Sequence, residues 1–288
     1  IGDNGYFSTM FDFNETIFGG SEKGWYDQTP ITPNDYRSCC FASQKKIGDI
    51  GMLSNIIENH DEPRGVSRYI PEGECTPVSK KLLATMNIML RGLPFIYQGQ
   101  EIGMTNLLFD KISDYKDVMT FNNWRVFKKL GFSEKRFLKL AKDVSRENAR
   151  TPVQWSEDKN AGFTSGTPWF NINPNYKEIN VEDDLKNPDS ILNFYRKLIK
   201  LRKENEVLIY GKYKEYDHFN PSLYTYERVY GDKRVLVVCS FKEKSVRFNA
   251  PKGYDLNKGE LVLCNYSDNR IVNNGFVTKP YEVRVYMF

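Results

Sequence analysis

The chain has 288 residues, of which 40% are hydrophobic and 27% are charged, and its formal net charge is +4. These values are typical of a folded globular protein with one large domain or two of ordinary size. The small net charge does not indicate nucleic acid or an anionic membrane as a partner. No apolar run approaches the roughly 20 residues of a membrane-spanning helix.

The cysteines are five in number, and none stands in a Cys-x-x-Cys spacing: Cys39, Cys40, Cys75, Cys239 and Cys264. They indicate neither a disulfide framework nor a zinc site, and they fit a reducing compartment. We therefore expect a cytoplasmic protein, and we expect neither a metal nor a cofactor. Aromatic residues make up 14% of the chain. They suit the faces of sugar rings, although core packing explains them more simply.

Three short apolar segments near the start of the chain predict buried strands: Gly5 to Asn14, Met52 to Ile57, and Leu93 to Tyr97. A short helix is expected between the first two. A second helix is expected before the third, because apolar residues recur at helical spacing from Leu82 to Leu90 and Gly92 then ends it. A strand, a helix and a strand in this order predict parallel strands joined by a right-handed crossover.

Polar residues follow two of these strands at the point where each one ends. His60 and Asp61 come after the second strand, and the glycine-bounded loop Gln98 to Glu101 comes after the third. The carboxyl ends of parallel strands meet at one rim of the fold, where functional groups gather. We expect both segments at that rim. From the residues alone, a functional site and an ordinary hydrogen-bonded turn are equally good explanations of the His-Asp pair.

The middle of the chain is polar and irregular from Thr105 to Val144, with a basic helical stretch from Ser133 to Lys142 that we interpret as a solvated face. The segment Ser145 to Trp155 holds two arginines and a tryptophan around a proline. It could grip a polar ligand or form salt bridges within a loop. A helix is predicted from Ile191 to Lys203.

From about residue 205 the pattern changes to short alternating strands separated by Gly, Asn and Pro. This predicts an antiparallel β-sandwich of about 80 residues. We place a domain boundary there, between residues 1–205 and 206–288. The expected strands are Val207–Tyr213, Leu223–Tyr230, Val235–Phe241, Ser245–Phe248, Glu260–Asn265 and Tyr281–Phe288.

Four ordered segments resemble the α-amylase superfamily (glycoside hydrolase family 13), and more narrowly its oligo-1,6-glucosidase and α-glucosidase branch. They are Asn59–Arg64, Gly92–Met104, Arg146–Trp155 and Asn173–Val181. The resemblance implies an α/β fold, a (β/α)8 TIM barrel followed by a β-sandwich. It also implies a retaining mechanism with an Asp nucleophile, a Glu acid/base and a second Asp that stabilises the transition state.

The resemblance assigns the role of that second, catalytic Asp to Asp61, with His60 and Arg146 as substrate-binding residues. Three positions depart from the family pattern. Gln100 stands where Glu is usual, Glu147 stands where Asp is usual, and Met119 replaces an acidic residue expected near the leaving sugar. The last of these departures bears on the preference for the leaving sugar.

Nothing in the sequence resembles the strands that carry the nucleophile and the acid/base in this family. A complete barrel takes about 250 residues, whereas we expect only the family's sixth, seventh and eighth strands in residues 1–205. We therefore interpret the chain as a C-terminal portion that is inactive alone. Its open strand edges and uncovered apolar face predict self-association or marginal order in the barrel part.

The leading functional prediction is that the whole protein is a glycoside hydrolase, an α-glucosidase acting on short α-1,6- or α-1,4-linked oligosaccharides. One alternative is a sucrose isomerase or a trehalose-forming transglucosidase. Another, of a different class, is a non-catalytic relative that binds sugar or a protein partner. The expected partner is an oligosaccharide substrate, and neither nucleic acid nor a membrane is expected.

Overall fold

The computed structural model describes residues 1–13, 26, 31–241 and 244–288. Its first sheet has three parallel strands in the order β1-β2-β3, which confirms the predicted parallel arrangement. Their bounds are Thr9–Phe11 for β1, Met52–Asn55 for β2 and Leu93–Pro94 for β3. All three strands are shorter than predicted, and Asn14, the last residue of the first predicted strand, lies outside the described residues.

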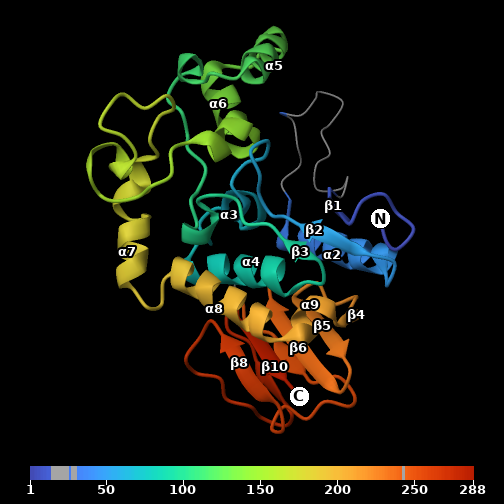
Figure 1. The fold of residues 1–288 in the computed structure, drawn as a ribbon. Coiled ribbons are helices and arrows are strands. Elements are labelled where there is room, and N and C mark those ends of the chain that lie inside the picture. The colour runs from blue at the N-terminus through green and yellow to red at the C-terminus, as the bar shows by residue number, and fades with distance from the viewer. Residues whose placement is uncertain (14–25, 27–30, 242–243) are drawn as a thin grey trace.

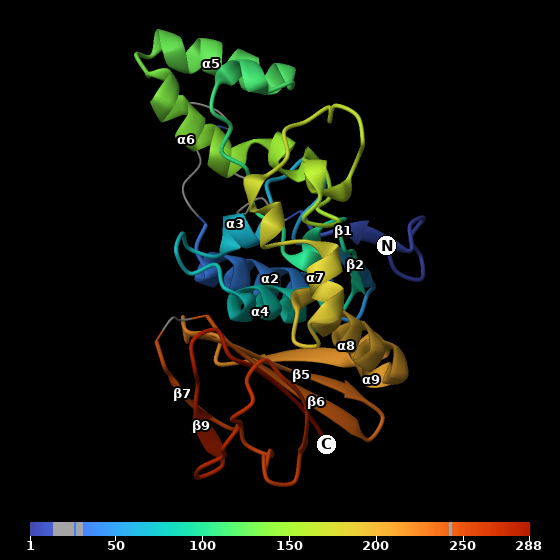
Figure 2. The same cartoon turned by 90° about the vertical axis from the view of Figure 1, so that its left-hand side faces the viewer.

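Two helices lie between this sheet and the larger sheet of the molecule (Figure 2). They are α2, Pro33–Ile47, and α4, Pro77–Met89. Helix α4 confirms the predicted helix and begins earlier, at a capping box formed by Thr76 and Ser79 with Pro77 in its first turn. It is buried from Ser79 to Met89, because it packs against α8, Ile191–Glu204, and against the larger sheet.

The larger sheet is antiparallel and has the strand order β4-β5-β6-β10-β8. Alternate residues along its strands enter two different cores. Tyr224, Val237 and Val285 face the helices, whereas Leu236 and Tyr286 face a second layer that contains the two-stranded sheet β7-β9. The bounds are β4 Lys212–Tyr216, β5 Leu223–Tyr230, β6 Lys233–Ser240, β7 Arg247–Asn249, β8 Glu260–Cys264, β9 Gly275–Val277 and β10 Val283–Met287.

One predicted strand is wrong. The segment predicted as Val207–Tyr213 is the short helix α9, Glu206–Tyr210, followed by β4. Its apolar residues were assigned to a strand because they form a run too short to show a helical period. Val207 and Leu208 are both fully buried against the helices and the sheet. Strand β9 was not predicted.

The opposite end of the molecule holds α5, Val118–Lys129, and α6, Glu134–Val144 (Figure 1). Helix α6 confirms the predicted basic helix: it buries Phe137 and Leu138 while its lysines face solvent. Helix α5 falls in a stretch predicted to be irregular. A core of mainly aromatic side chains, among them Phe127 and Phe137, joins the two helices. Among the described residues, no helix is both long and apolar enough to cross a membrane.

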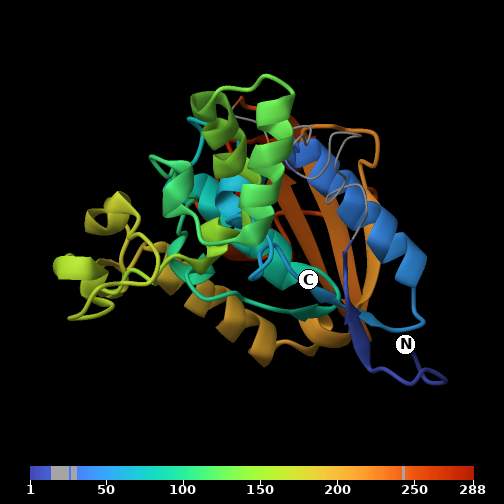
Figure 3. The ribbon, with the colours of Figure 1, turned by 90° about the horizontal axis from the view of Figure 1, so that it is seen from above.

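The remaining helical segments are short. Residues 151–180 extend to one side of the molecule, in yellow and yellow-green when seen from above (Figure 3). The segments are α3 Gly65–Tyr69, η1 Gln100–Ile102, η2 Ile112–Asp114, η3 Arg146–Arg150, η4 Lys159–Gly162, η5 Pro174–Lys177 and α7 Val181–Lys186.

Candidate functional site

The His60–Asp61 pair lies on a loop that leaves the end of β2 and returns at the start of α3. A buried ion pair between Glu58 and Arg64, 3.2 Å from Oε2 to Nη1, closes the base of this loop. The backbone N–H of Asp61 donates to the side-chain oxygen of Asn59 at 2.7 Å, which makes a tight turn. The loop therefore presents His60 and Asp61 to solvent, with side chains that are 71% and 51% exposed.

The loop after β3 lies against the loop that carries His60 and Asp61, as expected if both follow the carboxyl ends of parallel strands. Arg64 Nη1 donates to the carbonyl of Gln98 at 2.7 Å. Gly99 has φ +89°, and a Cβ there would meet the Met104 sulfur at 2.4 Å, so only glycine fits. Gln100 is buried and donates to the Tyr195 hydroxyl at 2.9 Å. These contacts fix the loop after β3 beside the loop that carries His60 and Asp61.

Two arginines of η3 converge on the carboxylate of Asp61. Arg146 Nη1 lies 3.2 Å from Asp61 Oδ1, and Arg150 Nη2 lies 2.8 Å from the same oxygen. His60 Nε2 lies 3.3 Å from the other oxygen, Oδ2. The structure therefore brings together all three predicted site residues, His60, Asp61 and Arg146. Asp61 and Arg146 are in contact although they are 85 residues apart in the sequence.

Sequence reasoning missed Asp117 as a member of this cluster. Asp117 accepts hydrogen bonds from both Nε and Nη2 of Arg146, the latter at 3.0 Å, and its side chain is 4% exposed. Burial raises the pKa of this carboxyl, but hydrogen bonds from Arg146 and from the Met119 backbone N–H outweigh burial, and the pKa lies below its usual value. Asp117 is therefore ionised at neutral pH. Its hydrogen bonds to Arg146 raise the pKa of that guanidinium.

Arg150 was part of a predicted arginine-containing loop but was not assigned to the site. Besides Asp61, it binds the main-chain carbonyl of His60 through Nε at 2.9 Å, and its Nη1 lies 3.8 Å from Asp117. Two guanidinium groups and two carboxylates thus form one balanced network. Its solvent-facing edge offers the acceptor Oδ2 of Asp61 beside a histidine ring, which suits the neighbouring hydroxyls of a sugar.

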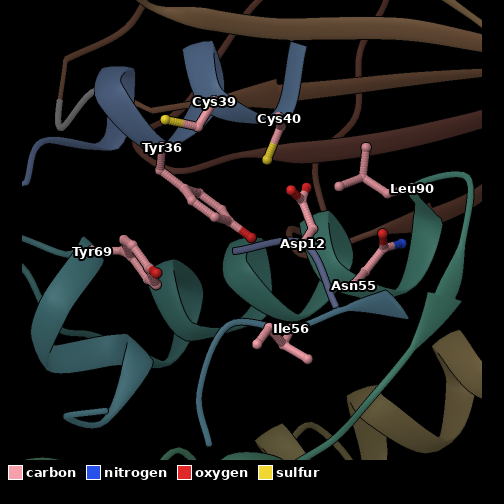
Figure 4. Close-up of a pocket in the computed structure, with 8 residues that line it drawn as sticks. All are labelled: Asp12, Tyr36, Cys39, Cys40, Asn55, Ile56, Tyr69 and Leu90. Carbon is pink, nitrogen blue, oxygen red and sulfur yellow. The ribbon is translucent and has the colours of Figure 1, made fainter. Parts of the chain in front are cut away.

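A separate small cavity lies between α2 and β2 (Figure 4). Its volume is about 20 Å³, and the Asp12 carboxylate and the Cys40 thiol face it. Asp12 accepts a hydrogen bond from Ser43 at 2.8 Å, and burial raises its pKa. A space of this size suits a water-sized group and is too small for a sugar.

Comparison with known proteins assigns the chain to a family. Residues 3–211 match the family model described as the catalytic domain of alpha amylase. The chain belongs to the alpha-amylase family. It is 40% identical over 282 residues to an oligo-1,6-glucosidase of Halalkalibacterium halodurans, an alignment that covers 96% of this chain and 50% of that protein. The resemblance to the family and to its oligo-1,6-glucosidase branch is therefore confirmed.

Solved structures of the family agree. Trehalose-6-phosphate hydrolase of Bacillus licheniformis superposes with a TM-score of 0.90 at 37% identity, covering 97% of this chain and 51% of that one. Isomaltulose synthase from Klebsiella sp. LX3 superposes with a TM-score of 0.88 at 33% identity, covering 97% and 50%. The α/β fold class is thus confirmed, and the chain spans about half the length of the curated relatives it matches.

Proposed function

We propose that this chain supplies the sugar-holding side of the active site of a retaining α-glucosidase that hydrolyses short α-1,6- or α-1,4-linked glucosides. The observation that carries the proposal is the presentation of Asp61 to solvent by two arginines beside His60. The oligo-1,6-glucosidases among its relatives support this substrate class.

In this proposal Asp61 accepts hydrogen bonds from ring hydroxyls that tighten as positive charge develops on the glucosyl unit. The two arginines hold the Asp61 carboxylate in one orientation. His60 and Arg146 donate to hydroxyls of the same unit. His60 is the more exposed of the two.

A titration of the 288-residue chain with isomaltose and maltose tests the assignment of Asp61. Binding followed by calorimetry or NMR should be clearly weaker in D61N, because an amide carries no charge and offers only one acceptor oxygen. D232N serves as the matched control, since Asp232 is exposed in the β5–β6 hairpin. Absence of glucoside binding by the unmodified chain, or equal binding by D61N, would contradict the proposal.

The same chain should bind without cleaving. Cleavage requires a nucleophile and a protonated acid. Asp117 is ionised, so it cannot be the acid, and its carboxylate is buried and bound by two nitrogens of Arg146, so it is not accessible as a nucleophile. In this proposal Asp61 holds the sugar. We propose that the nucleophile and the acid/base are supplied by other residues of the whole protein. Release of glucose from isomaltose by the 288-residue chain would contradict this part alone.

A second candidate function is transfer of the glucosyl unit in place of hydrolysis. The similarity to isomaltulose synthase favours this candidate. The similarity to trehalose-6-phosphate hydrolase adds a further disaccharide to those that the whole protein could accept. Sucrose and trehalose 6-phosphate therefore belong in the titration beside isomaltose. Preferential binding of sucrose would favour the isomerase alternative. Binding of sugars unrelated to α-glucosides, such as cellobiose, with equal affinity would favour a non-catalytic sugar-binding relative.

We further propose that β1, β2 and β3 are the sixth, seventh and eighth strands of a (β/α)8 barrel and that residues 206–288 form a C-terminal β-sandwich domain. The parallel order of the three strands supports the first assignment, and the change to antiparallel strands after α9 supports the second. Limited proteolysis tests the boundary: the first cuts are expected near residue 205, between α8 and α9, with the two products held together by the core that α4 and α8 share with the antiparallel sheet, and uniform degradation would contradict it.

The outer strands of the parallel sheet and its exposed apolar residues support self-association of the chain. Phe11 and Phe95 lie with ring centroids 4.9 Å apart and are 43% and 41% exposed. Met10 of β1 and Leu93 of β3 are more exposed still. An apolar patch of this kind is usually covered by another polypeptide. Light scattering should report a dimer or larger species, and a monodisperse monomer would contradict this.

A further inference from the structure

Arg150 makes a pair of contacts that no other residue of the site makes. Its Nε donates to the main-chain carbonyl of His60 at 2.9 Å, while its Nη2 donates to Asp61 Oδ1 at 2.8 Å. One rigid, planar group therefore holds the backbone of one residue and the carboxylate of the next. This fixes the direction in which the Asp61 side chain leaves the loop.

Such a clamp matters here because the loop has little other restraint at this point. The side chains of His60 and Asp61 are 71% and 51% exposed, and the turn bond from the Asp61 N–H to Asn59 restrains only the backbone. An exposed aspartate without further partners exchanges between rotamers freely. A carboxylate that must meet a sugar hydroxyl has to be held in one orientation.

Arg146 plays a different part, although it also contacts Asp61 Oδ1. Its Nε and Nη2 are both used on Asp117, and only Nη1 turns to Asp61, at 3.2 Å. Asp117 is itself fixed by the Met119 backbone N–H at 2.9 Å. The buried carboxylate of Asp117 thus orients Arg146, which contacts Asp61 through one nitrogen. Arg150 instead uses two nitrogens of its guanidinium on the loop that carries Asp61.

We infer that Arg150 is the positioning residue for Asp61: by clamping His60 and Asp61 together it keeps Asp61 Oδ2 directed at the ligand. The inference rests on the proposed function for the identity of the ligand, but the clamp itself does not depend on it. Without Arg150, the Asp61 carboxylate keeps only its contacts with one nitrogen of Arg146 and with His60, and it is free to rotate, so Oδ2 is no longer held toward the ligand. Loss of Arg150 should therefore weaken sugar binding with little effect on folding, because the pair is partly exposed.

The first test needs no ligand. Backbone ¹⁵N relaxation and the Asp61 side-chain carboxyl ¹³C signal should report increased mobility at residues 60 and 61 in R150A. R150K should behave like R150A, since one ammonium group cannot reproduce a planar fork on two oxygens. R125A is the matched control, because Arg125 is exposed on α5, where it donates to the neighbouring Asn122. Unchanged mobility at 60 and 61 in R150A would overturn the inference, whatever the chain binds.

The second test uses isomaltose as the probe. R150A should weaken its binding at least roughly tenfold, the order of loss expected when an oriented group is released, whereas R125A should leave it unchanged. The effect must act through Asp61, so R150A should add nothing when D61N is already present. Added guanidinium ion should restore part of the affinity of R150A. A fully additive loss in the double variant would show a direct contact or a general structural effect and would overturn positioning. If no variant or parent binds isomaltose, the proposed function fails, and the relaxation test still decides the clamp.

Discussion

The two sheets of the molecule differ in how completely their apolar faces are covered. The antiparallel sheet is buried on both faces, by α4 and α8 on one side and by the β7-β9 layer on the other. The parallel sheet is left with Phe11, Phe95 and their neighbours in contact with solvent. Stability is therefore concentrated around the antiparallel sheet, whereas the parallel sheet supports loops that present charged groups.

Two pairs of arginines illustrate the same division. Around the antiparallel sheet, Arg202 and Arg228 are buried and donate to main-chain carbonyls at the end of α4, including Ile88 for Arg202 and Met89 for Arg228. A cation is favourable at that helix end. Arg146 and Arg150 above the parallel sheet pair with carboxylates and remain 28% and 29% exposed. Arg202 and Arg228 hold buried elements together, whereas Arg146 and Arg150, which share the exposed carboxylate of Asp61, are accessible to a ligand.

The sharpest way to break this comparison is to remove Arg228. Its guanidinium donates to four carbonyls, those of Gly211, Met89, Leu208 and Ile209. R228A should lower the free energy of unfolding by about 3–5 kcal/mol, because these buried acceptors lose their donor and a cavity is left. Urea unfolding measures the loss. R196A, on the exposed face of α8, is the control, and an equal effect of the two variants would contradict the division.

A second test concerns the buried pair at the base of the site loop. Burial raises the pKa of Glu58 to about 7, against the attraction of Arg64. Because the folded form binds the proton more tightly than the unfolded form, this contribution to stability is present below pH 4.5 and is lost as the pH rises through 7. The unfolding free energy of the parent minus that of E58Q should fall by roughly 3 kcal/mol between pH 4.5 and 8. A difference that stays constant would show that Arg64 keeps Glu58 ionised throughout.

The local parts of the fold were open to prediction from the sequence. The run from Met52 to Ile57 followed by His60 and Asp61 predicted a buried strand with a polar end, and helix α4 was predicted from its spacing, although its C-cap is Leu90 and not Gly92. Each of these patterns is local, because the residues that form it lie close together in the sequence. The same local reasoning failed at Val207–Tyr213, where burial against the sheet decides between helix and strand.

The completed site was less open to prediction, because its contacts join distant segments. Asp117 sits at the N-cap of α5 in a stretch without a clear period, and its value to the site comes from Arg146, 29 residues away. Arg150 reaches back 90 residues to the His60 carbonyl. A signal was available: two arginines four apart need counter-charges when they lie near a buried core, and an acidic N-cap nearby is a natural candidate.

The smallest expected effect is at the exposed face of the parallel sheet. F95S should change the free energy of unfolding by less than about 1 kcal/mol, since a ring that is 41% exposed gains only part of the burial energy of a core residue. F248S, which removes a ring that is 1% exposed in the core beside the antiparallel sheet, should cost several kcal/mol, about 3–5. F95S should at the same time reduce self-association in light scattering, because it removes apolar surface from the proposed contact. If F95S destabilised the chain as much as F248S, the face would already be part of a closed core, and the contrast between the two sheets would not hold.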